Sequence, residues 1–194
     1  MRETATADAD RFLALLQPIE RELETYCRRL MWEPQEVPDA LQNAVLRAYR
    51  AFDRYREGAS FRAWMFKILT REAFALNRKH ARIARHEFQL EPEELAGLPL
   101  VAETSPEPKD WQPLSSEVLD GALEPVVAAG LKTLTDNERA VLLLRAIGGL
   151  RYREIGEALS LPLGSVMGNL SRARQKMRAY LAHSARKASL LKES

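Results

Sequence analysis

The C-terminal third of the chain carries side chains whose types and spacing suit contact with nucleic acid. Arg172, Arg174 and Lys176 place cations along one short segment, and Ser165 lies where a helix start could donate a hydrogen bond to a phosphate. These residues belong to a stretch, 150–178, that has the order of a helix-turn-helix: a short amphipathic helix, a tight turn and a second, basic helix. The chemistry that they indicate is binding of DNA, with Arg172 as the best candidate to read a base.

The basic helix must present these cations by burying its other side. Apolar residues recur along it at spacings of three and four: Val166, Leu170, Ala173, Met177 and Leu181. The positions between them are expected to face outward, toward the major groove of DNA: Met167, Gly168, Ser171, Arg172 and Gln175. The helix before the turn is expected to begin near Tyr152 and to bury Ile155 and Leu159.

Charge is segregated along the chain, although its 194 residues sum to a net charge of only +2. Residues 47–85 hold eleven Lys or Arg against three acids, which indicates a second candidate surface for phosphates. Residues 87–124 hold ten Asp or Glu and one Lys, with prolines interspersed, which is typical of a linker. The sequence therefore predicts two domains, 1–86 and 125–194, joined by an acidic linker, 87–124.

Helical periodicity runs through both domains, so the predicted fold class is all-α. In the first domain we expect helices over residues 10–30, 38–53 and 61–85. The inner face of the second helix is predicted from its spacing: Leu41, Val45, Ala48 and Phe52. In the third helix, four residues are predicted to pack in the core: Phe61, Trp64, Phe66 and Ile68. Of these, Trp64 is expected to be the most buried.

The second domain carries its own helix signals. Thr135 and Glu138 have the spacing of a capping box, so a helix should start at Thr135. Gly148 and Gly149 suit a left-handed helix stop, which places the end of that helix near them.

The sequence offers little for catalysis. No nucleophile has an adjacent base, and the three histidines are too scattered to form a metal cluster, so neither an enzyme nor a cofactor is expected. The single cysteine, Cys27, is expected to pack in the core. No apolar run reaches about 18 residues and the N-terminus lacks the apolar segment of a signal peptide. We therefore expect no membrane insertion and a cytoplasmic protein.

Several segments together carry a resemblance to a known family. In the first domain they are Asp39–Tyr55 and Ser60–Ile68. In the second domain they are Leu134–Arg145, Tyr152–Leu159, Leu161–Val166 and Ser171–Arg174. In this order the chain resembles a bacterial RNA polymerase sigma factor of the sigma-70 family, from the extracytoplasmic-function (ECF) group. The resemblance implies two small helical domains, a sigma-2-like bundle and a sigma-4-like helix-turn-helix.

The resemblance implies a non-catalytic subunit that docks on core RNA polymerase and recognises and opens promoter DNA. It places the polymerase contact on one polar helix face: Asp39, Gln42 and Asn43. It places capture of an unstacked base of the melting element in a loop with Tyr55, Arg56 and Ser60. The cations spaced to follow the strand's phosphates are Arg62, Lys67, Arg71, Arg78 and Lys79. The residues expected at the upstream element are Ser165, Met167, Gly168, Ser171, Arg172, Arg174 and Lys176.

Departures from the family's pattern bear on regulation and recognition. Asn43 stands where an acid is typical, and one hypothesis is that an activating kinase supplies the missing charge by phosphorylating Ser60 or Thr70. Met167 and Asn169 replace the usual basic residues of the recognition helix, so upstream recognition is expected to be weak or unusual. The family's default control is an anti-sigma factor, which is therefore an expected partner.

Two other functions stay open at this point. A stand-alone helix-turn-helix regulator would use the N-terminal bundle to dimerise or to sense a signal, and it would bind palindromic DNA without polymerase. A polymerase-bound inhibitor or adaptor would keep the fold and lose promoter reading, which Met167 and Asn169 favour.

Overall fold

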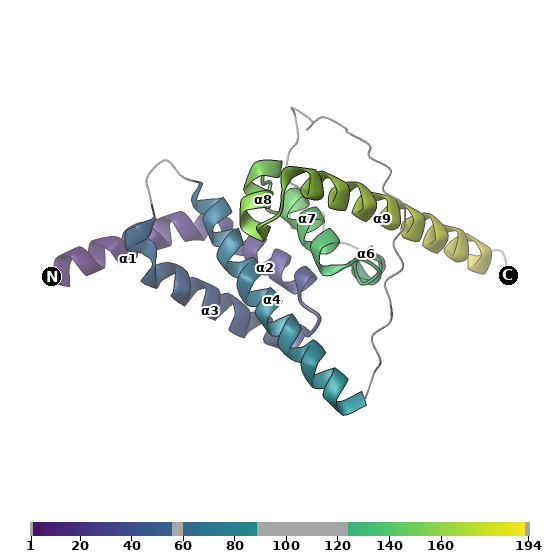
Figure 1. The fold of residues 1–194 in the computed structure, drawn as a ribbon, viewed down its shortest axis with the longest axis horizontal. Helices are drawn as coiled ribbons and strands as arrows, with labels where there is room; N and C mark the ends of the chain where they lie inside the picture. Colours follow the sequence, from purple (N-terminus) through teal and green to yellow (C-terminus); the bar gives the residue numbers. More distant parts are fainter. Residues whose placement is uncertain (1, 56–59, 89–123, 193–194) are drawn as a thin grey trace.

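A computed structural model of the chain describes residues 2–55, 60–88 and 124–192. These residues form helices and no strands, so the predicted all-α class is confirmed. The N-terminal unit contains α1 (Arg2–Leu16), α2 (Glu20–Leu30), α3 (Val37–Arg50) and α4 (Phe61–Phe88). The C-terminal unit contains α6 (Glu124–Leu131), α7 (Asp136–Ala146), α8 (Tyr152–Leu159) and α9 (Leu163–Lys192). Figure 1 shows the units side by side, with α1 and α9 reaching toward opposite ends of the molecule. Nearly all of the predicted linker lies outside the described residues.

The first predicted helix is divided in the structure. α1 already begins at Arg2 and ends at Leu16, a 3-10 turn covers Gln17–Ile19, and α2 follows. Pro18, at the centre of the turn, has no N–H to donate to a continuing α-helix. The prediction of one continuous helix was therefore wrong. It relied on the helical spacing of the apolar residues, which continues across this break and so does not reveal it.

Aromatic side chains hold the N-terminal unit together. The Phe12 and Phe52 rings meet edge to face, with their centroids 5.2 Å apart. Deeper in the bundle, Tyr26 packs against Phe66 at 5.1 Å, and the Tyr26 hydroxyl hydrogen-bonds with Oγ1 of Thr70 at 2.7 Å. Burial raises the pKa of the Tyr26 hydroxyl, which therefore stays protonated and keeps its hydrogen bond. This core fixes α4 against α2.

Two predictions about burial have opposite outcomes. Cys27 is buried, as predicted, and burial raises the pKa of its thiol to about 12. The prediction for Trp64 was wrong, because its ring is only half-buried, whereas Phe66 is fully buried and Phe61 is 7 % exposed. At about 100° per residue, Trp64 lies well away from the α4 face that contains Phe66. Ile68 is likewise half-buried.

α3 packs against its neighbours through small side chains. Its buried residues are Val37, Ala40, Ala44 and Ala48. The predicted inner residues Leu41 and Val45 are only half-buried, whereas Ala48 and Phe52 are buried as predicted. Small residues at a helix contact allow the two axes to approach closely, so the larger side chains lie at its margins.

The C-terminal unit follows its sequence signals closely. Oγ1 of Thr135 accepts a hydrogen bond from the Glu138 backbone N–H at 3.3 Å, and the Glu138 carboxylate accepts one from the Thr135 N–H at 3.0 Å. The predicted capping box is therefore confirmed. Gly149 has a φ of 64°, the left-handed conformation predicted just after α7. α8 begins at Tyr152 as predicted, and Ile155 is fully buried, whereas Leu159, at the end of the helix, is only half-buried.

The inner face of α9 is only partly as predicted. Val166, Leu170 and Ala173 are buried, but Met177 is half-buried and Leu181 is 37 % exposed. The prediction for Leu181 was wrong because α9 extends beyond the rest of the C-terminal unit, as Figure 1 shows.

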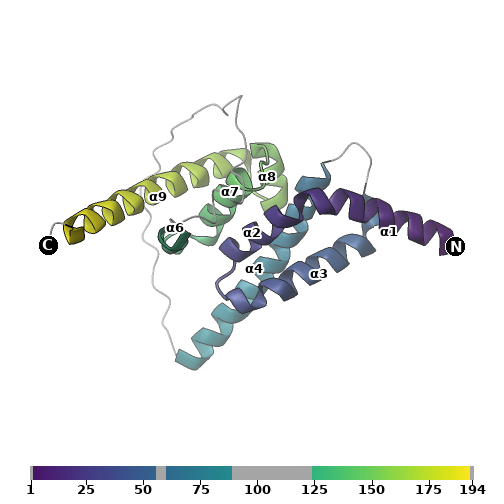
Figure 2. The ribbon, with the colours of Figure 1, turned by 180° about the vertical axis from the view of Figure 1, so that it is seen from behind.

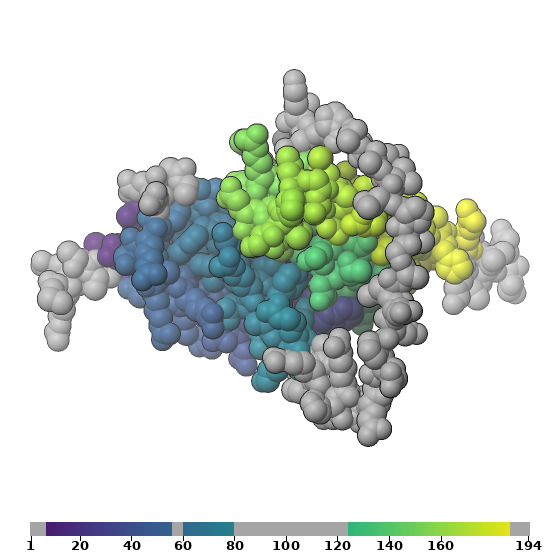
Figure 3. Space-filling model, viewed as in Figure 1, coloured from purple at the N-terminus to yellow at the C-terminus, as the bar shows by residue number. Residues whose placement is uncertain are grey.

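The two units pack directly on each other. α8 lies against α4, and α7 lies against α2. The views from the front and from behind agree on this arrangement (Figure 1 and Figure 2). In the space-filling view, the surfaces of α4 and α8 adjoin (Figure 3). The fold therefore places the helix-turn-helix beside the basic helix α4.

We expect Gly156→Ala to lower the free energy of unfolding by about 1–3 kcal/mol. A Cβ at this position would lie 2.9 Å from the backbone oxygen of Leu161, in the turn between α8 and α9. The matched control is Gly164→Ala, because nothing lies within 4 Å of a Cβ there, and its effect should stay within about 0.5 kcal/mol. Equilibrium unfolding in urea measures both, and equal losses would contradict the prediction.

Candidate nucleic-acid and protein interfaces

One side of α3 presents an exposed surface that we call the α3 face. It contains the three residues predicted there, Asp39, Gln42 and Asn43, all exposed. Leu46 and Tyr49 continue this side at helical spacing and are 43 % and 40 % exposed. Large apolar side chains exposed beside polar ones are typical of a protein-contact site. Sequence reasoning missed Leu46 and Tyr49, although their spacing of four and seven from Gln42 was the available signal.

Tyr55 and Ser60 lie near the start of α4, whereas Arg56, predicted beside them, lies outside the described residues. The Tyr55 and Trp64 rings are in contact, with centroids 5.5 Å apart, and both are half-buried. Oγ of Ser60 accepts a hydrogen bond from the Ala63 N–H at 3.1 Å, so the exposed Ser60 caps α4. The start of α4 thus combines accessible aromatic surface with a hydroxyl group.

The cations predicted for α4 lie on different sides of the helix. Lys67, Arg71 and Arg78 share the outward side, since they are separated by nearly whole turns at about 100° per residue. Arg71 and Arg78 are exposed and Lys67 is half-buried. Lys79 is also exposed but points about a third of a turn away from them. The structure therefore brings three of the predicted cations into one stripe.

Arg62 lies on the inner side of α4 and has protein partners. Its Nη2 donates to Oε1 of Glu22 in α2 at 3.1 Å. Its Nη1 donates to the backbone oxygen of Gly148, just after α7, at 3.3 Å. The guanidinium therefore joins the two units, and the role of Arg62 toward DNA stays a prediction.

The predicted reading residues of α9 are less exposed than expected. Ser165, at the start of the helix, is exposed. The others are half-buried: Met167, Gly168, Ser171, Arg172, Arg174 and Lys176. Met167 packs partly against the buried core, so its predicted outward orientation is only partly correct, whereas Gln175 is exposed as expected.

One buried carboxylate holds two of these cations. Oε2 of Glu138 accepts a hydrogen bond from Nζ of Lys176 at 2.8 Å, and its Oε1 lies 3.4 Å from Nε of Arg172. The Arg172 guanidinium also donates to Oδ1 of Asn169 at 3.1 Å. Glu138 thus caps α7 and positions α9 as well. Sequence reasoning found the first role and missed the second, because 38 residues separate Glu138 from Lys176.

The pKa of Glu138 reflects these contacts. Burial alone would raise it, since the side chain is only 4 % exposed. The hydrogen bonds from Lys176 and from the Thr135 backbone, together with the charges of Lys176 and Arg172, outweigh burial and lower the pKa below its ordinary value. Glu138 is therefore ionised at neutral pH, where it holds both cations.

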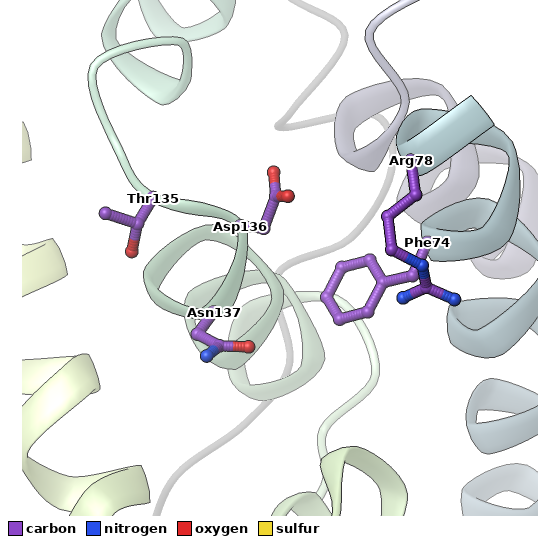
Figure 4. Close-up of a pocket in the computed structure, with 5 residues that line it drawn as sticks. All are labelled: Phe74, Arg78, Thr135, Asp136 and Asn137. Atoms are coloured by element: carbon purple, nitrogen blue, oxygen red, sulfur yellow. The ribbon is translucent and has the colours of Figure 1, made fainter. Parts of the chain in front are cut away.

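A cleft of about 330 Å³ lies between the units beside the start of α7 (Figure 4). Phe74 and Arg78 of α4 line one side, and Thr135, Asp136 and Asn137 line the other. Arg78 therefore lies at the edge of the contact between the units and remains exposed. The charged and polar lining argues against a pocket for an apolar ligand.

The two hydroxyls considered for phosphorylation differ in access. Thr70 is 1 % exposed, and its hydroxyl donates to the backbone oxygen of Phe66 at 2.6 Å, so a kinase has no access to it in this fold. Ser60 is exposed and remains the accessible candidate.

Within the described ranges, no three His, Cys, Asp or Glu side chains are placed to hold a metal ion together. None of the described helices combines the length and the apolar character needed to cross a membrane.

Both units match models of one protein family. Residues 15–83 match sigma-70 region 2, and residues 127–177 match sigma-70 region 4. Over 181 residues the chain is 25 % identical to the ECF RNA polymerase sigma factor SigW of Bacillus subtilis, which covers 93 % of this chain and 94 % of that protein. Over 154 residues it is 32 % identical to the ECF RNA polymerase sigma factor SigE of Mycolicibacterium smegmatis, which covers 79 % and 55 %.

The fold is similar to that of a solved structure. It matches the sigma factor RpoE in complex with the anti-sigma factor NepR from Bartonella quintana, with a TM-score of 0.66 and 21 % sequence identity. The match covers 90 % of this chain and 97 % of that one.

We expect Glu138→Gln to lower the free energy of unfolding by about 1–3 kcal/mol at pH 7, because the ionised carboxylate loses its charge-assisted hydrogen bonds. The lowered pKa of Glu138 stabilises the fold above the ordinary carboxyl pKa, and this stabilisation is lost as the pH falls through the lowered value. The difference between the variant and the wild type should therefore shrink in acid.

Urea unfolding at pH 7 and at successively lower pH measures this difference. Glu157→Gln, on the exposed side of α8, is the control and should change stability little at any pH. A Glu138→Gln effect that does not depend on pH would contradict the electrostatic role.

Proposed function

Because the chain belongs to the sigma-70 family of RNA polymerase sigma factors, in its ECF group, we propose how its two units share the work of transcription initiation. A sigma factor binds core polymerase and recognises and opens promoter DNA, and it is not by itself a catalytic enzyme. We assign polymerase docking and DNA opening to residues 1–86, and reading of the upstream element to residues 125–194. The observation that carries this proposal is the match of region 2 and region 4, in that order, to the two packed units.

The α3 face is the proposed docking surface for core polymerase. Hydrogen bonds to a partner can be made there by Asp39, Gln42 and Asn43. Exposed apolar surface, which a partner could bury, is added by Leu46 and Tyr49. This combination of polar and apolar side chains favours a protein-contact site over a helix face that is only solvated. Asn43, in place of an acid, would reduce the electrostatic part of the contact.

The start of α4 is the proposed site for the melting element. The half-buried Tyr55 and Trp64 rings leave aromatic surface on which an unstacked base could pack, and Ser60 supplies a polar group beside it. Arg71 and Arg78, with Lys67, form the stripe that would follow the strand's phosphates. Sequence reasoning treated Trp64 as core, and its exposure makes it a further candidate for this contact.

The start of α9 is the proposed reader of the upstream element. Ser165 is exposed at the helix start, where a phosphate can be bound. Arg172 is held by Glu138 and Asn169 in a fixed direction, which favours a specific contact over a mobile one. Asn169 itself donates to the backbone oxygen of Ser165 at 2.7 Å. The contacts of Arg172 and Lys176 with Glu138 reduce the charge that α9 offers to DNA, which supports weak or unusual upstream recognition.

Two kinds of regulator fit the proposal. An anti-sigma protein is the first, since the similar RpoE chain is found with NepR, and the cytoplasm is the proposed location because the polymerase works there. An activating kinase is the second, with Ser60 as its site, because a phosphate at the exposed start of α4 would add charge at a helix N-terminus. Mass spectrometry of the protein from activated cells would show no modified Ser60 if the kinase hypothesis is wrong.

A polymerase-bound adaptor is the second candidate function. It is favoured by the half-buried Met167 and by the two α9 cations that Glu138 holds, since both reduce what α9 offers to DNA. The region 2 match counts against a stand-alone helix-turn-helix regulator.

Reconstituted transcription separates these candidates. The purified chain is mixed with core polymerase, and run-off transcription is measured from the promoter upstream of its own gene. Transcripts that depend on the added chain support a sigma factor. Binding to polymerase without transcription supports the adaptor, and a failure to bind polymerase would contradict both.

We expect the combined substitution Asp39→Ala, Gln42→Ala and Asn43→Ala to weaken binding to core polymerase by at least about tenfold, since it removes the polar part of the α3 face. Asn43→Asp is expected to strengthen binding, because it restores the acid. Fluorescence anisotropy with labelled chain measures both. Glu157→Ala on α8 is the control and should bind as the wild type does. Wild-type affinity of the combined variant would show that polymerase docks elsewhere.

A further inference from the structure

A chain of polar contacts connects the start of α9 to the start of α7. Nδ2 of Asn169 donates to the Ser165 backbone oxygen at 2.7 Å, and Oδ1 of Asn169 accepts a hydrogen bond from Nη2 of Arg172 at 3.1 Å. Nε of Arg172 lies 3.4 Å from Oε1 of Glu138. The Arg172 guanidinium is therefore contacted from its own helix and from α7 at the same time.

Glu138 is in turn held by its own helix. Its Oε2 accepts a hydrogen bond from the Thr135 N–H at 3.0 Å and another from Nζ of Lys176 at 2.8 Å. Burial of the side chain would raise its pKa, but these hydrogen bonds and the neighbouring cations lower it, so Glu138 is ionised at neutral pH. The carboxylate cannot turn away from Arg172 without also leaving the capping box of α7. The backbone of α7 therefore helps to set the direction of Arg172.

The cations of α9 fall into two sets. Arg172 and Lys176, four residues apart, share the side that meets Glu138. Arg174 and Arg178, also four residues apart, lie on the other side, since Arg174 is rotated by about 200° from Arg172 around the helix axis. Arg178 is exposed and Arg174 is half-buried. Glu138 therefore offsets the charge of one set and leaves the other set to meet phosphates.

A carboxylate in this position affects two properties of DNA binding in opposite ways. Phosphates attract cations whatever the base sequence, so offsetting two cations weakens sequence-independent binding. A base edge is read by a guanidinium that points in one direction, so fixing that direction favours the correct base. The Arg172 side chain is 35 % exposed and remains accessible for such a contact. Because specificity is a difference of affinities, both effects increase it.

We infer that Glu138 is a specificity-determining residue for the upstream element, which positions Arg172 for a base and, by pairing with Arg172 and Lys176, weakens the attraction of α9 to DNA of any sequence. This role rests on the proposed reading of the upstream element by α9. Asn169 takes part in it, because it accepts the second contact of the Arg172 guanidinium from the position where a basic residue is usual.

The first test compares two variants that change the net charge equally. Glu138→Gln removes the charge that offsets Arg172 and Lys176. Glu154→Gln is the matched control, because Glu154 has the same position in the capping box of α8, where its carboxylate accepts a hydrogen bond from the Arg151 N–H at 2.7 Å. Binding of the full chain to duplex DNA of mixed sequence is measured by fluorescence anisotropy at several salt concentrations.

Glu138→Gln should bind this duplex severalfold more tightly than Glu154→Gln does. Its plot of the logarithm of the binding constant against the logarithm of the salt concentration should be steeper by about one to two units, because up to two further cations become available to phosphates. Equal slopes for the two variants would overturn the inference.

The second test measures discrimination between sequences. The full chain selects duplexes from a pool of random sequence, and sequencing gives the enrichment of the preferred site. Glu138→Gln and Asn169→Ala should each lower this enrichment by about tenfold, whereas Glu154→Gln should not. Only Glu138→Gln should also steepen the salt dependence, since Asn169 carries no charge.

A double-mutant cycle shows whether Glu138 acts through Arg172. In an Arg172→Ala background, Glu138→Gln should lower the enrichment no further, because the residue that it positions is already absent. A loss of the same size in that background would show a general effect on the fold and would overturn the positioning role. All binding is measured at a temperature at which urea unfolding shows each variant to be folded.

The selection separates failure of this role from failure of the proposed function. If the wild type enriches no sequence, the proposed reading of the upstream element by α9 fails, and the role of Glu138 fails with it. If the wild type enriches a site and Glu138→Gln enriches it equally well, the proposed function stands and the role of Glu138 alone is overturned.

Discussion

The arrangement depends on one constraint: α4 is a single helix of 28 residues that must satisfy three environments at once. Its inner side packs Phe66 and Thr70 into the aromatic core, and its outward side carries the stripe of Lys67, Arg71 and Arg78. α4 also packs against α8 of the C-terminal unit. Successive residues of an α-helix are related by a rotation of about 100° around the helix axis and a rise of about 1.5 Å along it. The aromatic core of the N-terminal unit therefore also sets the direction of the α4 cations.

Two carboxylates hold cations of the predicted DNA-binding helices, and they differ in burial. The Glu138 side chain is only 4 % exposed, and it both caps α7 and contacts Lys176 and Arg172 of α9. Its removal would leave these two cations without their acidic partner. Glu22 is 27 % exposed and holds Arg62 at 31 % exposure. Solvent-exposed ion pairs contribute about 0–1 kcal/mol, whereas a hydrogen bond to a charged group contributes about 1.5–3 kcal/mol. The Glu138 contacts therefore contribute more to the fold than the more exposed pair of Glu22 and Arg62 does.

How well the sequence predicts a feature of this structure depends on how far apart in the sequence the interacting residues lie. The capping box at Thr135, the left-handed Gly149 and the start of α8 follow from contacts within a few residues, and each is as predicted. Trp64, Leu181 and the break at Pro18 were missed because helical spacing alone says neither where a bundle ends nor where a helix is interrupted. The partners of Arg62 and Lys176 lie 40 and 38 residues away in the sequence, so no local pattern could have identified them. The sequence thus identified exposed residues on α3 correctly. It did not identify the carboxylates, distant in the sequence, that contact the cations of α4 and α9.

The expected weak binding of the C-terminal unit to DNA is compatible with its proposed role. Met167 and Asn169 add no positive charge to α9, and Glu138 already neutralises part of the charge of Arg172 and Lys176. A free domain of this kind would bind DNA poorly, because phosphate contacts supply most of the non-specific affinity. Once the N-terminal unit is docked on polymerase, however, the covalent connection makes upstream binding intramolecular. The linker then sets a high effective concentration of the C-terminal unit near the DNA, which compensates for its weak affinity. Poor binding by the free unit then becomes an advantage, since it leaves the choice of promoter to the assembled complex.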